Sequence, residues 1–101
     1  MFSQYGPDAI IQRAAPLHRE PPRYPTNALA AGVEGVALVM FTVEADGSTS
    51  NGEVLYTVPH PVFGEAALEA LENWEYSPLT VDGIAIRREG VVTQFQFALN
   101  Q

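Results

Sequence analysis

Residues 35–44 place apolar side chains on both faces of an extended chain, and this pattern constrains the fold more than any other feature of the sequence. Successive side chains of a β-strand point to opposite faces, so alternate residues share a face. A strand that is apolar on both faces lies in the centre of a sheet or is covered on both sides. One face carries Ala37, Val39, Phe41 and Val43, and the other carries Val36, Leu38, Met40 and Thr42.

Two further strands are predicted beside this one. The turn signal Asp46-Gly47 follows it, and an apolar run at residues 54–58 then favours a hairpin. A second turn signal, Asp82-Gly83, precedes a short extended stretch at residues 84–86 and a last alternating run. In that run Val91, Thr93, Phe95, Phe97 and Leu99 share one face, and Val92, Gln94, Gln96 and Ala98 share the other.

Two segments carry the signals of helices. Residues 26–31 are rich in alanine, Pro25 suits the first turn and Gly32 suits the position just past the end, which together predict a short helix. Between residues 63 and 74 the apolar period becomes that of a longer helix, which Pro78 would end. Its apolar face carries Phe63, Ala66, Ala67, Ala70, Leu71 and Trp74, and its outer face carries Glu65, Glu69, Glu72 and Glu75.

The chain length limits how these elements combine. A chain of 101 residues supports one modest core, and the order helix, hairpin, helix, strand leaves too little chain for parallel crossovers. We therefore expect an α+β fold in which an antiparallel sheet of about three strands, with room for a short extra strand, packs against two helices. Residues 1–15 are expected to form an N-terminal arm or the end of a linker, and residues 16–101 the domain, which opens with a proline-rich extended segment.

The charge balance excludes several classes of function. The chain has 12 Asp and Glu residues against five basic residues, all arginine, for a net charge of −7. A nucleic-acid-binding domain or a polybasic membrane-surface domain needs the opposite sign. Because the chain has no cysteine, disulfides and thiolate metal sites are excluded as well.

Residues that could carry out chemistry are sparse. His18 and His60 lie in proline-rich segments and are expected to be exposed loop residues, because a lone histidine seldom forms a metal site without clustered partners. The sequence contains no glycine-rich phosphate loop, HExxH motif or GxSxG motif. We therefore expect a non-enzymatic domain with no catalytic residues, no metal site and no cofactor.

The predicted longer helix raises two questions of interpretation. Its four glutamates are expected to form a solvated face, and Arg87, Arg88 or a cationic partner would offset their mutual repulsion. Trp74 would serve either as a stacking platform or as a core anchor. Its place on the apolar face favours the core.

Several short motifs occur in a fixed order. Pro22-Arg23-Tyr24-Pro25 precedes an alanine-rich turn, Glu34-Gly35 opens the alternating strand, and Phe41-Thr42-Val43 comes before Asp46-Gly47. Phe63 to Ala67 and Leu71 come next, then Trp74-Glu75-Tyr76-Ser77-Pro78 and finally Phe95-Gln96-Phe97. From about Pro16 to Leu99 this ordered set resembles the C-terminal domain of the TonB energy-transducer family.

The resemblance implies a periplasmic domain, tethered to the inner membrane by an N-terminal helix and a proline-rich linker and driven by proton-powered motor proteins. Such a domain binds the TonB box, a short segment of outer-membrane transporters for siderophores, cobalamin or other nutrients. The segment adds as a strand beside the last strand of the sheet. Carried over to this chain, the binding edge is Val91, Val92, Thr93, Gln94, Phe95, Gln96, Phe97 and Ala98, and the flanking contacts are Arg19, Pro21, Arg23 and Tyr24.

Physical reasoning supports this mode of binding and leaves two alternatives open. A strand at a sheet edge presents unpaired N–H and C=O groups, which are a template for strand addition, and Val92, Gln94 and Gln96 would contact alternate peptide side chains. In one alternative, a second copy of the chain covers the same edge, because Val36, Leu38 and Met40 form an apolar second face that a partner would cover. In the other, the chain is a TonB-like periplasmic interaction module of a signalling or assembly protein.

Overall fold

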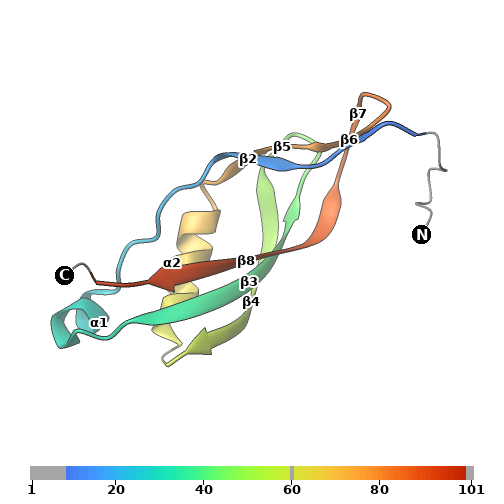
Figure 1. Cartoon of the computed structure of the whole chain (residues 1–101). Coiled ribbons are helices and arrows are strands. Elements are labelled where there is room, and N and C mark those ends of the chain that lie inside the picture. The colour runs from blue at the N-terminus through green and yellow to red at the C-terminus, as the bar shows by residue number, and fades with distance from the viewer. Residues whose placement is uncertain (1–8, 60, 100–101) are drawn as a thin grey trace.

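A computed structural model describes residues 9–59 and 61–99 of the chain, so His60 lies outside the described residues. At its centre is an antiparallel sheet in which β3 (Gly35–Val43) lies between β4 (Thr49–Val58) and β8 (Arg88–Phe97). Helix α2 (Val62–Leu71) lies across one face of this sheet, and the short helix α1 (Thr26–Ala31) lies at one end (Figure 1). The predicted α+β fold, a three-stranded antiparallel sheet with two helices, is confirmed.

Strand β3 is the central strand, as its two apolar faces predicted. It pairs antiparallel with β4 on one edge and with β8 on the other. Its four residues on the helix side are at most 1% exposed: Ala37, Val39, Phe41 and Val43. On the opposite side Val36, Leu38 and Met40 are half-buried, and the neighbouring Tyr56, Val58 and Val92 are 55%, 40% and 50% exposed.

The hairpin between β3 and β4 turns at the predicted Asp46-Gly47. Gly47 has φ +90°, and its N–H donates to the Glu44 carbonyl at 2.9 Å. The Ser48 N–H and hydroxyl both donate to Asp46 Oδ1, and these bonds lower the pKa of Asp46. The Ser50 hydroxyl and then Arg87 likewise lower the pKa of Glu44, so both carboxylates stay ionised and stabilise the turn.

Helix α1 forms where its flanking residues predicted it. Pro25 precedes its first residue, and Gly32 ends it with φ +69°, where its N–H donates to the Leu29 carbonyl at 3.2 Å. A left-handed residue at this position satisfies carbonyls that the helix itself leaves free. Ala28 is the residue of α1 that packs into the core.

Helix α2 is shorter than predicted. It ends at Leu71: the Glu72 N–H still donates four residues back, to Leu68, but those of Asn73 and Trp74 donate three residues back, to the carbonyls of Ala70 and Leu71. This tighter turn leaves Trp74 outside the helix, so the prediction that Trp74 and Glu75 lie on helix faces is wrong. Trp74 is nonetheless 5% exposed, so its assignment as a core anchor is confirmed.

Short strands form two small sheets at the far end of the molecule from α1 (Figure 1). Strand β2 (Ala15–His18) pairs with β5 (Glu75–Ser77), and β6 (Leu79–Val81) lies between β1 (Ile11–Gln12) and β7 (Ile84–Ile86). The sequence predicted the extended stretch that forms β7 and an extended segment from residue 16 that overlaps β2, but none of the pairings between these strands. The pairings of β1 with β6 and of β2 with β5 join very short strands that lie far apart in the sequence, and such pairing leaves no periodic pattern to detect. The division of the chain at residue 16 stays a prediction.

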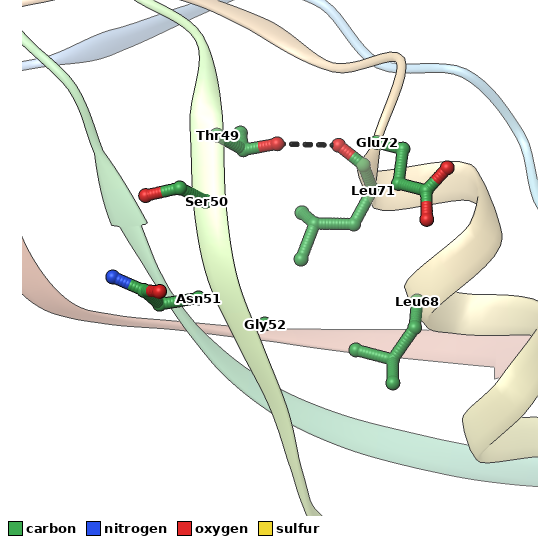
Figure 2. A pocket seen from close by; sticks show the side chains of 7 residues that line it. All are labelled: Thr49, Ser50, Asn51, Gly52, Leu68, Leu71 and Glu72. Atoms are coloured by element: carbon green, nitrogen blue, oxygen red, sulfur yellow. Dashed lines mark hydrogen bonds between the residues drawn. The ribbon is translucent and has the colours of Figure 1, made fainter.

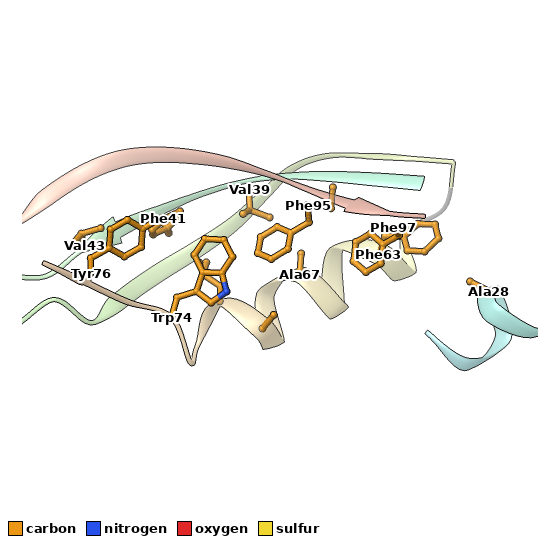
Figure 3. Close-up of a cluster of buried hydrophobic side chains, with 13 residues drawn as sticks. Ala28, Val39, Phe41, Val43, Phe63, Ala67, Trp74, Tyr76, Phe95 and Phe97 are labelled. Atoms are coloured by element: carbon orange, nitrogen blue, oxygen red, sulfur yellow. The ribbon is translucent and has the colours of Figure 1, made fainter. Parts of the chain in front are cut away.

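The core is a row of aromatic side chains between the long sheet and α2 (Figure 3). Trp74 lies 4.9 Å from Phe95 and 6.2 Å from Phe41, measured between ring centroids. Farther along, Phe63 of α2 lies 4.7 Å from Phe97 of β8. Aromatic residues therefore fix the C-terminal part of β8, at Phe95 and Phe97, against the other side of the core.

Candidate functional site: the free edge of β8

Within residues 9–59 and 61–99, strand β8 pairs on one side only, with β3. It is the end strand in the order β4–β3–β8, and its pairing with β3 is regular from the pair Gly35 and Phe97 to the pair Phe41 and Val91. No residue from 91 to 97 is charged. Proteins commonly protect an exposed edge with charges, prolines or bulges. This part of β8 has none of these, so it offers a regular template for an added strand.

The side chains of β8 alternate as predicted. Phe95 and Phe97 are buried, Val91 and Thr93 are half-buried, and Val92, Gln94 and Gln96 are exposed on the other face. A strand paired along this edge would therefore meet a valine and two glutamine side chains on the open face.

Strand β8 ends one residue before the last residue of the predicted edge. Ala98 lies beyond the end of β8, because β3 begins at Gly35 and its last pairing is with Phe97. The chain is held differently after that point, since the Leu99 N–H donates to Glu34 Oε2 at 2.8 Å. At its other end β8 begins at Arg88, three residues before the predicted edge, where Arg88 pairs with Val43.

The opposite edge strand, β4, is a poorer template. Its pairing with β3 is irregular at two places, and Asn51 adopts φ +53°. Helix α2 packs beside it, where the Thr49 hydroxyl donates to the Leu71 carbonyl at 2.6 Å (Figure 2). A pocket of about 230 Å³ lies there between β4 and the end of α2. Irregular pairing of this kind twists an edge away from further strands.

The proline-rich segment before α1 lies against the core beside β8. The Trp74 indole Nε1–H donates to the Glu20 carbonyl at 2.8 Å, and the Arg19 guanidinium lies 5.1 Å from the centre of the Trp74 ring. Because Trp74 in turn contacts Phe95, Trp74 links Arg19 to the C-terminal part of β8.

Tyr24 fixes the other end of this segment. Its ring meets Phe97 and Phe63 edge-on, with centroids 5.8 Å and 6.0 Å away, and its hydroxyl donates to the Val33 carbonyl. Burial and the nearby charge of Glu34 raise the pKa of Tyr24, so the phenol stays protonated and keeps its donor. The structure thus brings Arg19 and Tyr24 together with β8.

The two remaining predicted contacts lie differently. Pro21 is exposed between Arg19 and Tyr24, and Arg23 lines a groove with Glu65 and Glu69 of α2. Arg23 is therefore the cation beside the glutamate face. The prediction that Arg87 and Arg88 offset this face is wrong, because Arg87 pairs with Glu44 and Glu89, and Arg88 donates to the Glu89 carbonyl.

Little in the described part of the chain suggests catalysis. Among residues 9–59 and 61–99, no three histidine, aspartate or glutamate side chains gather into a possible metal site. His18 is exposed in β2 with its Nε2 3.2 Å from Glu20 Oε1. The Ser50 hydroxyl donates to Glu44, whose pKa is lowered, so this carboxylate is a poor base.

Comparison with known proteins decides the family. The model of the family described as "Gram-negative bacterial TonB protein C-terminal" matches residues 20–99. The chain belongs to this TonB C-terminal family.

Relatives in this family include Protein TonB of Pseudomonas aeruginosa, which is 35% identical over 74 residues, covering 73% of this chain and 22% of that protein. Protein TonB of Escherichia coli K12 is 36% identical over 62 residues, covering 61% of this chain and 26% of that protein. The chain therefore spans about a quarter of the length of these relatives.

Solved structures from the family share the fold. The solution structure of the Pseudomonas aeruginosa TonB C-terminal domain has a TM-score of 0.75 at 32% identity, covering 89% of this chain and 90% of that one. The TonB2 protein of Vibrio anguillarum gives a TM-score of 0.65 at 35% identity, covering 100% and 92%. In residues 9–59 and 61–99 of the TonB-like chain, no helix has the length and apolar character needed to cross a membrane.

Sequence reasoning missed two features near β8. One is the Glu20 carbonyl that accepts the Trp74 N–H, because a backbone acceptor leaves no mark in a sequence. The other is Arg13, which lies between β1 and β2 and lines a groove with the start of β8. The apolar pair Ile10-Ile11 was a weak signal for β1, which pairs with β6 through its backbone while both isoleucine side chains stay exposed.

Proposed function

We propose that the chain is the periplasmic docking domain of a TonB-type energy transducer. It binds the TonB box of outer-membrane transporters as a strand added to the free edge of β8. Inner-membrane proton-driven motor proteins, acting through an anchor outside this stretch, supply the force that opens the transporter for siderophore-type or cobalamin-type nutrients. The domain itself is a non-enzymatic mechanical coupler.

One observation carries the proposal: the edge at residues 91–97 is regular, uncharged and free on the side away from β3. Backbone hydrogen bonds contribute about 1 kcal/mol net each, so a short added strand with some side-chain burial reaches micromolar affinity. Such an affinity suits a coupling that forms and releases. The bonds from Trp74 and Tyr24 support the edge from behind by holding the segment from Arg19 to Tyr24 against the core.

Proline substitution in β8 tests the edge directly. Proline lacks the N–H group, so Gln94→Pro or Gln96→Pro is expected to weaken binding of a TonB-box peptide at least tenfold, measured by isothermal titration calorimetry. Gln94→Ala and Gln96→Ala keep the N–H and are expected to change the affinity less than threefold.

The direction of the N–H group supplies a control. Neighbouring residues of a strand point their N–H groups to opposite sides, so Thr93→Pro is measured beside Gln94→Pro. The variant that removes an N–H group facing β3 disrupts the sheet, and the other removes an N–H group facing the free edge. Circular dichroism identifies which of the two variants folds. Wild-type affinity in the folded proline variants at positions 93, 94 and 96 would contradict docking at this edge.

A second copy of the chain is the competing occupant of the same edge. The exposed apolar residues Tyr56, Val58 and Val92 on the open face of the sheet are the observation that favours it. Sedimentation equilibrium separates the two occupants. If the edge serves to dock a TonB box, the chain is expected to be a monomer at micromolar concentration. A dimer that dissociates when the peptide is added would mean that the second copy and the peptide bind the same edge.

A further inference from the structure

Strand β4 is irregular at Asn51 and Gly52, across β3 from the docking edge. These two residues of β4 lie opposite a single residue of β3, Phe41. Such a β-bulge leaves an extra residue unpaired and disrupts the ladder locally. The backbone of Asn51 adopts φ +53°, in the left-handed region that asparagine tolerates better than most residues, and both residues of the bulge are exposed. The main chain at this point is therefore open to water and less restrained than in a regular strand.

The packing of α2 favours glycine at position 52. A Cβ placed there would lie 2.9 Å from Leu68 Cδ2 and 3.3 Å from Leu71 Cδ2. Both leucines face β4 across a hollow of about 230 Å³, which Asn51 and Gly52 also line (Figure 2). The close approach of the helix to the strand thus places a glycine directly after an exposed asparagine.

An asparagine followed by glycine is the dipeptide in which the side-chain amide is lost most readily. The main-chain nitrogen of the second residue attacks the side-chain carbonyl carbon of the first, and a side chain on the second residue hinders this attack. Glycine has no Cβ and the most adaptable backbone. In this sequence Asn51 precedes glycine, whereas Asn27 precedes alanine, Asn73 precedes tryptophan and Asn100 precedes glutamine.

We propose that Asn51 is a self-modification site, at which the chain exchanges an amide for a carboxylate. The Gly52 nitrogen forms a bond to Asn51 Cγ, the bond from Cγ to Nδ2 breaks, and ammonia leaves with the proton of the Gly52 N–H. Water then opens the five-membered imide ring. Opening at Cγ gives aspartate, and opening at the main-chain carbonyl carbon gives isoaspartate. The net reaction consumes one water and releases one ammonia, with no oxidation or reduction.

The two products affect β4 differently. Aspartate keeps the length of the main chain and also tolerates the left-handed region, so the fold is retained and the net charge of −7 becomes one unit more negative. Isoaspartate adds a methylene group to the main chain beside Gly52, where Leu68 and Leu71 pack closely. The isoaspartate form is therefore expected to loosen the contact between α2 and β4.

Prolonged incubation of the folded domain at physiological temperature and pH tests the proposal. Loss of the amide raises the mass by about one unit, and peptide mapping assigns the change to a residue. Asn51 is expected to convert at least about tenfold faster than Asn27 or Asn73, because glycine hinders the attack least. Methylation by protein isoaspartyl methyltransferase detects the isoaspartate product.

Matched variants locate the reaction. Asn51→Gln keeps a neutral amide but would have to close a six-membered ring, so we expect no mass change at this position. Asn51→Asp, which tolerates the left-handed region, takes its place if circular dichroism shows that the glutamine variant does not fold. Asn27→Gln makes the same change at another exposed asparagine and is expected to leave the rate of the reaction unchanged.

The chain unfolded in guanidinium chloride is the reference for the folded domain. Because the bulge opens locally, Asn51 in the folded domain is expected to convert within about tenfold of the unfolded rate. An Asn51 that stays intact in the folded domain while the unfolded chain converts fully would overturn the proposal, and so would equal rates at Asn27, Asn51 and Asn73.

Amide shifts of the purified isoaspartate form test the structural consequence. We expect the amides of residues 68–71 to shift relative to the unmodified domain and those of residues 91–97 to stay in place, since β8 lies on the other side of β3. Unchanged amides at residues 68–71 would show that the modification does not loosen α2.

Discussion

Replacing Trp74 with alanine is expected to lower the free energy of unfolding by about 3 to 5 kcal/mol, the range for a large aromatic removed from a core. The side chain is 5% exposed and packs against Phe41 and Phe95. The substitution also removes the donor to the Glu20 carbonyl and the ring under Arg19. Urea unfolding followed by far-ultraviolet circular dichroism measures the change without relying on tryptophan fluorescence.

Trp74→Phe is the matched control. It keeps an aromatic ring in the core but loses the indole N–H, so we expect about 1 to 2 kcal/mol of destabilisation. Hydrogen exchange at Glu20 and Tyr24 should rise in both variants, because the segment loses its attachment to Trp74. A loss below 1 kcal/mol in Trp74→Ala would show that the ring is dispensable for the core.

Gly47→Ala is expected to destabilise the domain by about 3 to 5 kcal/mol. Gly47 adopts φ +90°, and a Cβ on it would overlap the carbonyl oxygen of Tyr76. A left-handed residue with a side chain costs about 1 to 3 kcal/mol, and forcing atoms into a packed site costs a similar amount. The Tyr76 N–H also donates to the Gly47 carbonyl at 2.8 Å, so the hairpin cannot move away from Tyr76 without breaking this hydrogen bond. Thermal and urea unfolding measure the change.

Gly83→Ala separates these two costs. Gly83 has φ +83°, close to that of Gly47, but no atom lies within 4 Å of a Cβ placed there. We expect about 1 kcal/mol of destabilisation from the backbone conformation alone. Equal losses at the two positions would mean that the contact between Gly47 and Tyr76 contributes nothing to the cost.

The elements that were predicted correctly depend on local patterns. The two apolar faces of residues 35–44 placed β3 in the centre, and the turn at Asp46-Gly47 predicted the hairpin. Pro25 and Gly32 set the ends of α1. In each case the physical cause lies within a few residues along the chain, so the sequence alone was sufficient.

The errors arise where tertiary contacts override the local pattern. Trp74 continues the helical period of α2, but the turn at Glu72 and Asn73 takes it out of the helix. Arg87 is held by Glu44, 43 residues away, and by Glu89, instead of by the helix glutamates. At the candidate site the alternation of residues 91–97 predicted most of β8, whereas the place of Arg13 depends on the pairing of β1 with β6. Such contacts between distant residues leave no local signal.

Peptide titration followed by amide chemical shifts tests the central proposal most directly. A TonB-box peptide is added to the isotope-labelled domain, and the amides of residues 91–97 are compared with those of residues 54–58 on the opposite edge strand. Strand addition predicts saturable shifts concentrated at residues 91–97, with half-saturation at micromolar peptide and little change on β4. Unchanged amides at residues 91–97 with millimolar peptide would contradict docking at the β8 edge.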